Sequence, residues 1–196
     1  MSKFEIMQRI VNINEARERL IEIIKFRSFQ SGSKIKLASG RSSKFYFNMK
    51  PTMLDPEGSY LIGLLALSLV ESDCTDLIGG LEMGAVPFAT SVSLISHIQN
   101  KPIPAFFVRK QIKEHGTQAQ IEGFSSGESI KGKRVIVVED VTTTGKSSLK
   151  AINIIRESGG VVIKVIAIID REEGASETFL EAGVSFESIL SLKDFS

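Results

Sequence analysis

The sequence predicts an α/β fold in which helices flank a central, mostly parallel β-sheet. Strand-length apolar runs alternate with helical patterns along the chain, and this alternation implies crossover connections between parallel strands. The run 135–138 is continuously apolar, as expected for a strand that is buried on both faces of such a sheet. The chain has 196 residues, the length of one domain, so we expect a single domain over 1–196.

The helices are predicted from the spacing of apolar residues and from their caps. In the first helix, Asn14 is the expected N-cap, and Leu20, Ile21 and Ile24 share one face. The helix that starts at Pro56 is apolar, with small residues on one side. The predicted helices span 14–26, 56–70, 85–97, the segment from Gly145 to 157, and 176–181.

The strands are predicted from short apolar runs between turn signals. The run 161–169 is the most apolar in the chain and is expected at the centre of the sheet. Residues 28–44 are predicted to form short strands and turns, and residues 110–127 a long polar loop. The remaining strands are predicted at 45–49, 76–79, 103–108, 134–138 and 186–192. Ligands of parallel sheets bind beyond the carboxyl ends of the strands. On that rim lie the loops that follow Ile78, Val108, Val138 and Ile169.

The composition argues against several classes of partner. Lys plus Arg is 24 and Asp plus Glu is 23, a net charge of +1 that gives no reason to expect nucleic acid or a membrane surface. No apolar run approaches the ~20 residues of a membrane span, and the N-terminus does not resemble a signal peptide. The one cysteine, Cys74, cannot form an intrachain disulfide, which is consistent with a reducing cytoplasm.

The most informative segment is 134–148, which reads RVIVVEDVTTTGKSS. Two carboxylates, Glu139 and Asp140, follow the apolar run, and a turn of threonines and a glycine then leads into a helix. A helix N-terminus offers free N–H groups and the positive end of the helix dipole to a phosphate. The acids would repel a bare phosphate, but they suit a ligand that also carries hydroxyl groups. A sugar phosphate has both.

Two other phosphate motifs are excluded here. The P-loop requires a glycine where this chain has Asp140, and the spaced glycines of the dinucleotide fingerprint are absent. An ordinary strand, turn and helix with a threonine N-cap is the alternative for this segment.

Two loops on the predicted rim allow two interpretations each. The glycine-rich loop 79–85 either brings backbone N–H groups close to a polyanion or is a tight turn that needs glycine. The loop 109–117 carries Arg109, Lys110, Lys113 and His115. It is either a solvated loop or a lid over the site.

Two further segments have alternatives as well. The aromatic residues of 45–48 either pack in the core or offer a stacking surface to a planar base. Asp170 and Arg171 either form a surface salt bridge or place an arginine to grip a carboxylate through two hydrogen bonds.

The segment VVEDVTTTGKS resembles the ribose-phosphate motif of type I phosphoribosyltransferases. The resemblance implies a site for 5-phosphoribosyl-1-pyrophosphate (PRPP). Glu139 and Asp140 would accept hydrogen bonds from the ribose 2′ and 3′ hydroxyls, and Asp140 would take part in catalysis. The residues implied to hold the 5′-phosphate are Val141, Thr142, Thr143, Thr144 and Gly145.

The loop after Val108 is similar to the mobile catalytic loop of orotate phosphoribosyltransferases, in which an Arg-Lys pair precedes Lys, His and Gly. In that family, the loop of one subunit closes over the active site of its neighbour. The resemblance therefore implies a homodimer with the lid 109–123 acting in trans. Lys113 and His115 would stabilise the departing pyrophosphate, and Arg109 and Lys110 would bind phosphates.

The segment 37–48 resembles the N-terminal hood of the same family, which residues 28–50 would form here. Tyr46 and Phe47 would cover the pyrimidine. The resemblance also implies that Arg171 binds the carboxylate of orotate and that Thr143 bonds to the same group or the base edge. Ala38 and Met83 stand where some relatives carry basic residues.

Together the resemblances imply a type I phosphoribosyltransferase-like fold and the transfer of the phosphoribosyl group of PRPP to orotate. The products would be orotidine 5′-monophosphate and pyrophosphate. Mg²⁺ is expected to bind mainly through PRPP and water, without a dedicated metal site in the protein. The alternatives are a phosphoribosyltransferase for another nucleobase, a regulatory protein that senses PRPP, and a scaffold without catalysis.

Lys113→Ala is predicted to lower turnover far more than it weakens PRPP binding, because Lys113 would act on the charge that develops as pyrophosphate leaves. Steady-state kinetics together with a direct PRPP binding measurement test this. An equal loss in both quantities would contradict a role in the transition state.

Overall fold

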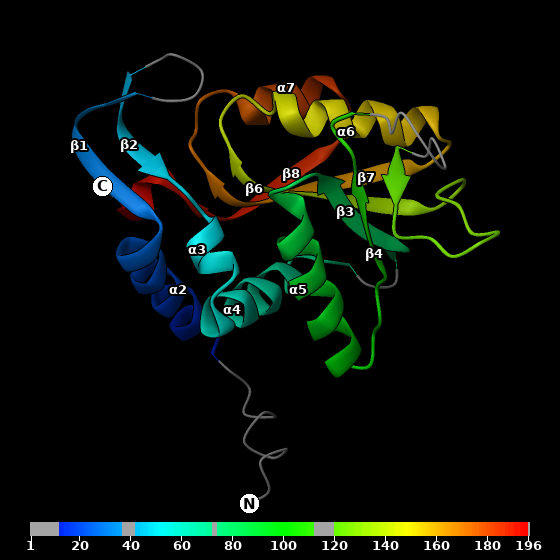
Figure 1. Ribbon diagram of the computed structural model, residues 1–196, viewed down its shortest axis with the longest axis horizontal. Helices are drawn as coiled ribbons and strands as arrows, with labels where there is room; N and C mark the ends of the chain where they lie inside the picture. The colour runs from blue at the N-terminus through cyan, green and yellow to red at the C-terminus, as the bar shows by residue number, and fades with distance from the viewer. Residues whose placement is uncertain (1–11, 37–41, 72–73, 112–119, 196) are drawn as a thin grey trace, which may run out of the picture.

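The computed structural model describes residues 12–36, 42–71, 74–111 and 120–195 (Figure 1). Its main sheet has six strands in the order β5-β4-β3-β6-β7-β8, and a separate two-stranded sheet pairs β1 with β2. The strands are β1 (Phe29–Lys36), β2 (Ser42–Phe47), β3 (Leu77–Leu81), β4 (Ala105–Val108), β5 (Ile121–Glu122), β6 (Arg134–Thr142), β7 (Val161–Asp170) and β8 (Ser185–Ser191). The helices are α2 (Ile13–Arg27), α3 (Lys50–Met53), α4 (Pro56–Leu67), α5 (Ala85–Ile98), α6 (Lys146–Glu157), α7 (Ala175–Glu181) and the 3₁₀ turn η2 (Leu192–Phe195).

The predicted α/β architecture is confirmed. All neighbouring pairs from β4 to β8 are parallel, and only the short edge strand β5 pairs antiparallel. In Figure 1, α6 and α7 lie above the sheet, and α2, α4 and α5 lie below it. The carboxyl ends of β3, β4, β6 and β7 therefore meet at one edge, as the sequence predicted.

The side chains of β6 alternate between the two faces of the sheet, which explains why its apolar run is continuous. Val135 and Val137 join the core on one side of the sheet, which includes Phe179. Ile136 and Val138 join the core on the other side, which includes Phe88. Successive side chains of a strand point to opposite faces, so a strand covered by helices on both sides must be apolar at every position.

Several predicted boundaries are wrong. The N-cap of the first helix is Asn12 rather than Asn14, because the Asn12 carboxamide oxygen accepts a hydrogen bond from the Asn14 N–H at 3.0 Å. The segment 110–127, predicted to be all loop, contains β5. The strand 161–169 is β7, which lies between β6 and β8 rather than at the centre; β3 and β6 are the middle strands. The short elements α3 and η2 were not predicted.

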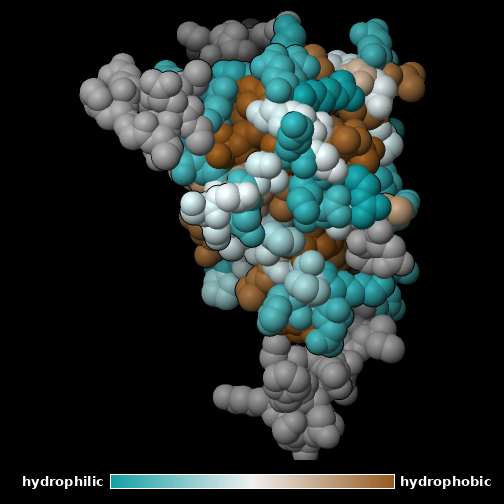
Figure 2. Space-filling model, turned by 90° about the vertical axis from the view of Figure 1, so that its right-hand side faces the viewer, coloured by the Kyte–Doolittle hydropathy of each residue, from teal (hydrophilic) through white to brown (hydrophobic). Residues whose placement is uncertain are grey.

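No helix within the described ranges is both long and apolar enough to cross a membrane. Figure 2 shows the face at the right of Figure 1, where brown apolar patches are broken up by teal hydrophilic residues.

Candidate active site

The acid pair lies inside β6 rather than after it. The strand was predicted to end at Val138, but it continues to Thr142, because Val141 and Thr142 pair with Ile169 and Asp170 of β7. The long apolar strand β7 supplies backbone partners beyond Val138, so the ladder of hydrogen bonds extends. Glu139 and Asp140 are thus held by the sheet, and the turn before α6 shrinks to three residues, 143–145.

A hollow of about 220 Å³ opens between the end of β6 and the N-terminus of α6. The lining residues come from the strand end, the turn and the first turn of the helix: Glu139, Val141, Thr142, Thr143, Thr144, Gly145, Lys146 and Ser147. The Thr142 hydroxyl is buried and has no hydrogen-bond partner among the described residues. A buried hydroxyl without a partner costs roughly 1–3 kcal/mol, so a ligand oxygen that bonds to Thr142 would remove a real penalty.

Gly145 fixes the shape of this turn. Its φ is 75°, in the left-handed region that other residues avoid. A Cβ at this position would also lie 2.9 Å from the ring of Phe179 in α7. Glycine is therefore needed both for the turn and for the packing of α7 behind the hollow, which explains the glycine of the TTTG motif.

Glu139 has a strongly shifted pKa. Burial and, next, the neighbouring Asp140 charge raise this pKa from the ordinary 4.5 to about 8, whereas a hydrogen bond from the Ser148 hydroxyl opposes the shift. The Ser148 Oγ donates to Glu139 Oε2 at 2.9 Å. The raised pKa of Glu139 lowers the negative charge of the acid pair, which reduces its repulsion of a phosphate. Hydrogen bonds donated by ligand hydroxyls would favour the ionised form.

The glycine-rich loop reaches the acid pair from β3. A Cβ at Gly84 would lie 2.5 Å from the Asp140 carboxylate, so this loop and Asp140 are in direct contact. Only glycine allows this approach. Asp140 does not line the hollow and instead faces the loop at the start of α5. Met83 is 60% exposed and brings no charge to the rim.

The start of the predicted lid is held by the loop after β3 and by helix α6. The Lys110 N–H donates to Glu82 at 2.9 Å, and the Lys150 ammonium donates to the Lys110 carbonyl at 3.1 Å. The Arg109 N–H donates to the Gln120 carbonyl at 2.8 Å. Arg109 and Lys110 are thereby fixed at the rim, near the acid pair. Lys113 and His115 lie outside the described residues.

Arg109 forms a long ion pair with Glu122. Its guanidinium lies 3.4 Å from Glu122 of β5, and its Nε is buried without a hydrogen-bond partner among the described residues. The long distance to Glu122 leaves the guanidinium able to bind an incoming phosphate.

Arg171 lies beside the threonine turn. Its N–H donates to the Thr142 carbonyl at 3.0 Å, and its guanidinium pairs with Glu173 at 2.6 Å. Arg171 and Asp170 are 7% and 8% exposed, and the Asp170 carboxylate accepts from the Glu172 N–H, so both residues are buried rather than on the open surface. Burial raises the pKa of Asp170. A buried arginine next to Thr143 suits the grip of a carboxylate.

The two aromatic residues of the predicted hood lie differently. Phe47 is 7% exposed and packs against Phe29 and Phe195, with ring centroids 5.0 Å from each. Tyr46 is half-buried and precedes it on the strand. Because alternate residues face opposite sides of a strand, Tyr46 points away from this cluster. For Phe47 the geometry favours the core alternative. Ala38 lies outside the described residues.

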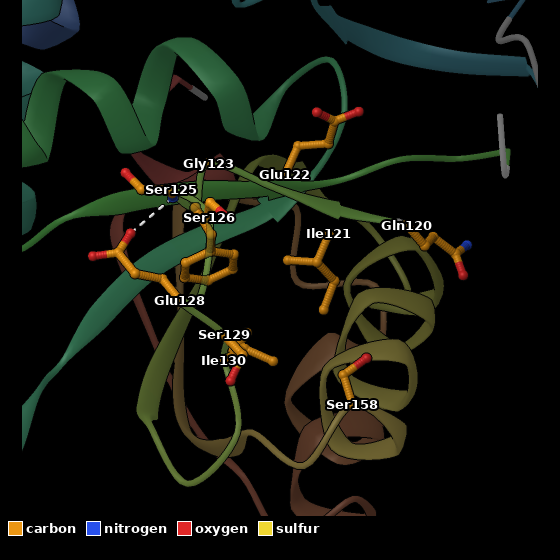
Figure 3. Close-up of a pocket in the computed structure, with 11 residues that line it drawn as sticks. Gln120, Ile121, Glu122, Gly123, Ser125, Ser126, Glu128, Ser129, Ile130 and Ser158 are labelled. Atoms are coloured by element: carbon orange, nitrogen blue, oxygen red, sulfur yellow. Dashed lines mark hydrogen bonds between the residues drawn. The ribbon is translucent and has the colours of Figure 1, made fainter. Parts of the chain in front are cut away.

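A larger cavity lies elsewhere. About 600 Å³ open beneath the segment 120–130 and reach Ser158 past the carboxyl end of α6 (Figure 3). Its charged side chains are Glu122 and Glu128, and Glu128 accepts the Ser125 N–H at 2.8 Å. A cavity with only acidic charges at the negative end of a helix disfavours phosphate. The smaller hollow is therefore the better candidate, despite its size.

Four contributors to the rim were not predicted from the sequence. They are Glu82, Lys146, Ser148 and Glu173. Lys146 lies within the segment VVEDVTTTGKS and Ser148 directly follows it, so their positions at the start of the predicted helix gave a usable signal. Glu82 meets Lys110 only through the fold, because 28 positions separate them.

Comparisons with known proteins identify the family of this chain. A family model for the phosphoribosyl transferase domain matches residues 59–186. The orotate phosphoribosyltransferase of Rhodopseudomonas palustris (strain BisB18) is 53% identical over 180 residues, which cover 92% of this chain and 96% of the relative.

The chain is also similar to solved structures of orotate phosphoribosyltransferases. The Mycobacterium tuberculosis H37Rv orotate phosphoribosyltransferase in complex with Fe(III) dicitrate has a TM-score of 0.79 and 37% identity, covering 92% of this chain and 99% of that chain. The structure of that enzyme in complex with PRPP has a TM-score of 0.74 and 35% identity, covering 91% and 98%.

Glu139→Gln is expected to remove a pH-dependent loss of stability. Because the folded-state pKa of about 8 exceeds the ordinary 4.5, the folded chain binds this proton more tightly than the unfolded chain. The free energy of unfolding therefore falls as pH rises between these values. The variant cannot ionise, so its melting temperature should exceed that of the wild type by roughly 5 °C at about pH 8.5 and by much less at about pH 5.

Glu157→Gln, at the exposed end of α6, makes the same chemical change away from the site and serves as the control. Thermal denaturation of the wild type and both variants across this pH range tests the prediction. Parallel pH profiles for the wild type and Glu139→Gln would show that Glu139 does not have a raised pKa.

Proposed function

We propose a role for each rim residue in the reaction of this chain. The chain belongs to the orotate phosphoribosyltransferase family. The enzyme transfers the phosphoribosyl group of PRPP to orotate, giving orotidine 5′-monophosphate and pyrophosphate in pyrimidine biosynthesis. The observation that carries the residue-level proposal is the hollow at the N-terminus of α6, bordered by Glu139 and the unpartnered Thr142 hydroxyl.

PRPP would bind with its 5′-phosphate in this hollow. Backbone N–H groups and hydroxyls of 141–145 would hold the phosphate at the positive end of α6. The ribose 2′ and 3′ hydroxyls would donate to Glu139 and Asp140, which β6 presents at consecutive positions. The glycine-rich loop, in contact with Asp140 at Gly84, would receive the pyrophosphate beside the ribose.

Orotate would bind between the threonine turn and the hood. Arg171 would bind the orotate carboxylate, with Thr143 on the same group or the base edge, and Tyr46 would cover the ring. Glu173 holds the guanidinium at 2.6 Å and so orients it. We propose that Phe47 acts from within the core, as the support behind Tyr46, rather than by stacking on the base.

The reaction would be a displacement at ribose C1 with inversion, through a transition state that resembles an oxocarbenium ion. Orotate is already anionic, so no strong base is required. The protein's part is to position both substrates and to stabilise the charge on the departing pyrophosphate. Lys113 and His115 would supply the positive charge that stabilises the pyrophosphate. Arg109 and Lys110 would bind phosphates at the base of the lid. Closure of the lid would exclude water.

The proposal includes Mg²⁺, bound mainly through PRPP and water. Within the described ranges, no group of three or more His, Cys, Asp or Glu could hold a metal ion. The nearby carboxylates of Glu139 and Asp140 are hard oxygen donors of the kind that Mg²⁺ accepts, so the residues fit a metal that arrives with its substrate. When bound, Mg²⁺ neutralises negative charge on the pyrophosphate.

A cytoplasmic homodimer with the lid 109–123 acting in trans completes the proposal. The single cysteine is consistent with a reducing compartment. The lid starts at the rim from two fixed residues, Arg109 and Lys110, which lie beside the acid pair.

The substrate assignment is tested by offering orotate, uracil and hypoxanthine in turn to the protein with Mg²⁺ and PRPP and following ultraviolet absorbance. Orotate alone should be consumed, because only orotate carries a carboxylate for Arg171. Omitting Mg²⁺ should abolish turnover. Turnover of hypoxanthine alone would refute the assignment.

The lid in trans is tested by mixing Lys113→Ala with Arg171→Ala, each nearly inactive alone. If the lid of one protomer serves the site of the other, a mixed dimer places both defects in one site and leaves the second intact. Random exchange should then restore about a quarter of wild-type activity. No recovery after verified exchange would mean that Lys113 acts in its own protomer.

A further inference from the structure

The end of the chain packs against the hood. η2 follows the edge strand β8, and the C-terminus lies beside β1 (Figure 1). The Phe195 ring lies 5.4 Å from Phe29 of β1 and 5.0 Å from Phe47 of β2, the latter edge to face. Phe29 in turn contacts Phe45 and Phe47, at 5.9 and 5.0 Å. One ring from the chain terminus thus completes a cluster built by both strands of the hairpin.

Polar contacts fix the turn that carries Phe195. Asp194 pairs with Arg17 of α2 at 2.7 Å, and the same carboxylate oxygen accepts the Ser191 N–H at 2.8 Å. The first contact ties η2 to the body of the protein, and the second ties it to the end of β8. Asp194 is 18% exposed at its side chain, so the pair is more than a solvent-screened surface contact.

The hairpin needs such a support. Two strands alone are marginally stable in water and depend on packing of one face. Phe29 pairs with Phe47 and Ser31 with Phe45, so Phe29, Phe45 and Phe47 share the face that meets Phe195. Gln30 pairs with Tyr46, on the other face. The position of Tyr46 therefore depends on how firmly the opposite face is packed.

We propose that Phe195 is a positioning residue for orotate, acting through Phe29 and Phe47 to hold Tyr46 over the base site. The inference rests on the proposed function, in which Tyr46 covers orotate. Phe195 lies on the β8 side of the sheet, whereas the phosphate hollow lies between β6 and α6. Loss of its ring should therefore affect the base and spare PRPP.

The test compares Phe195→Ala, Phe195→Leu and the wild type in steady-state kinetics. For Phe195→Ala, the KM for orotate should rise about tenfold while the KM for PRPP stays within about twofold. Phe195→Leu refills most of the space and should recover most of the orotate affinity. A role confined to stability would instead lower the active fraction and leave both KM values unchanged.

Ile103→Ala is the matched control. It also removes a side chain from the same core, 3% exposed, but just before β4, far from the carboxyl edge. It should lower the melting temperature without moving the KM for orotate. A similar rise in that KM for Ile103→Ala and Phe195→Ala would overturn the proposal.

Asp194→Asn keeps an acceptor for Ser191 and removes the ion pair with Arg17. The KM for orotate should rise about threefold, which carries the test if Phe195→Ala does not fold. An unchanged KM for orotate in Asp194→Asn would then refute the inference. If the wild type fails to use orotate, the proposed function fails instead. If the wild type uses orotate and the variants match it, only the positioning role fails.

Discussion

The pairing of β6 with β7 beyond Val138 is the constraint on which the site depends. It carries the sheet through Val141 and Thr142 and so holds two adjacent acids on rigid backbone. The turn that remains is short and needs the left-handed Gly145, and it places the start of α6 directly beside Glu139. A looser connection would leave the acids and the phosphate hollow without a fixed spacing.

The groups around Glu139 and Asp140 determine how each of these two acids is held. Burial raises the pKa of Glu139 to about 8, and Ser148 supplies a donor that compensates for part of the lost hydration. Asp140 turns to the loop from β3, where only glycine at position 84 leaves room. One strand end thus contacts two different loops, because neighbouring residues of a strand point to different sides.

The periphery is joined to this centre through backbone contacts. Glu82 accepts the Lys110 N–H after β4, and Arg171 donates its N–H to the Thr142 carbonyl. On the far edge, the terminal turn supports the hood through Phe195. Residues more than a hundred positions apart in the chain therefore pack together at this edge of the sheet.

Apolar periodicity and glycine placement are local signals, so the chain alone was enough to predict the α/β architecture, the strand before Glu139 and Asp140, and the glycine turn that follows them. The positions of Arg171 and of the basic loop after β4 were also predicted, because each follows a strand. Three features became known from the folded structure alone: β6 runs to Thr142, Glu82 accepts the Lys110 N–H, and Phe47 packs against Phe195. These depend on partners distant in the chain, whose strand pairing, pKa shifts and ring contacts arise only when the fold brings them together.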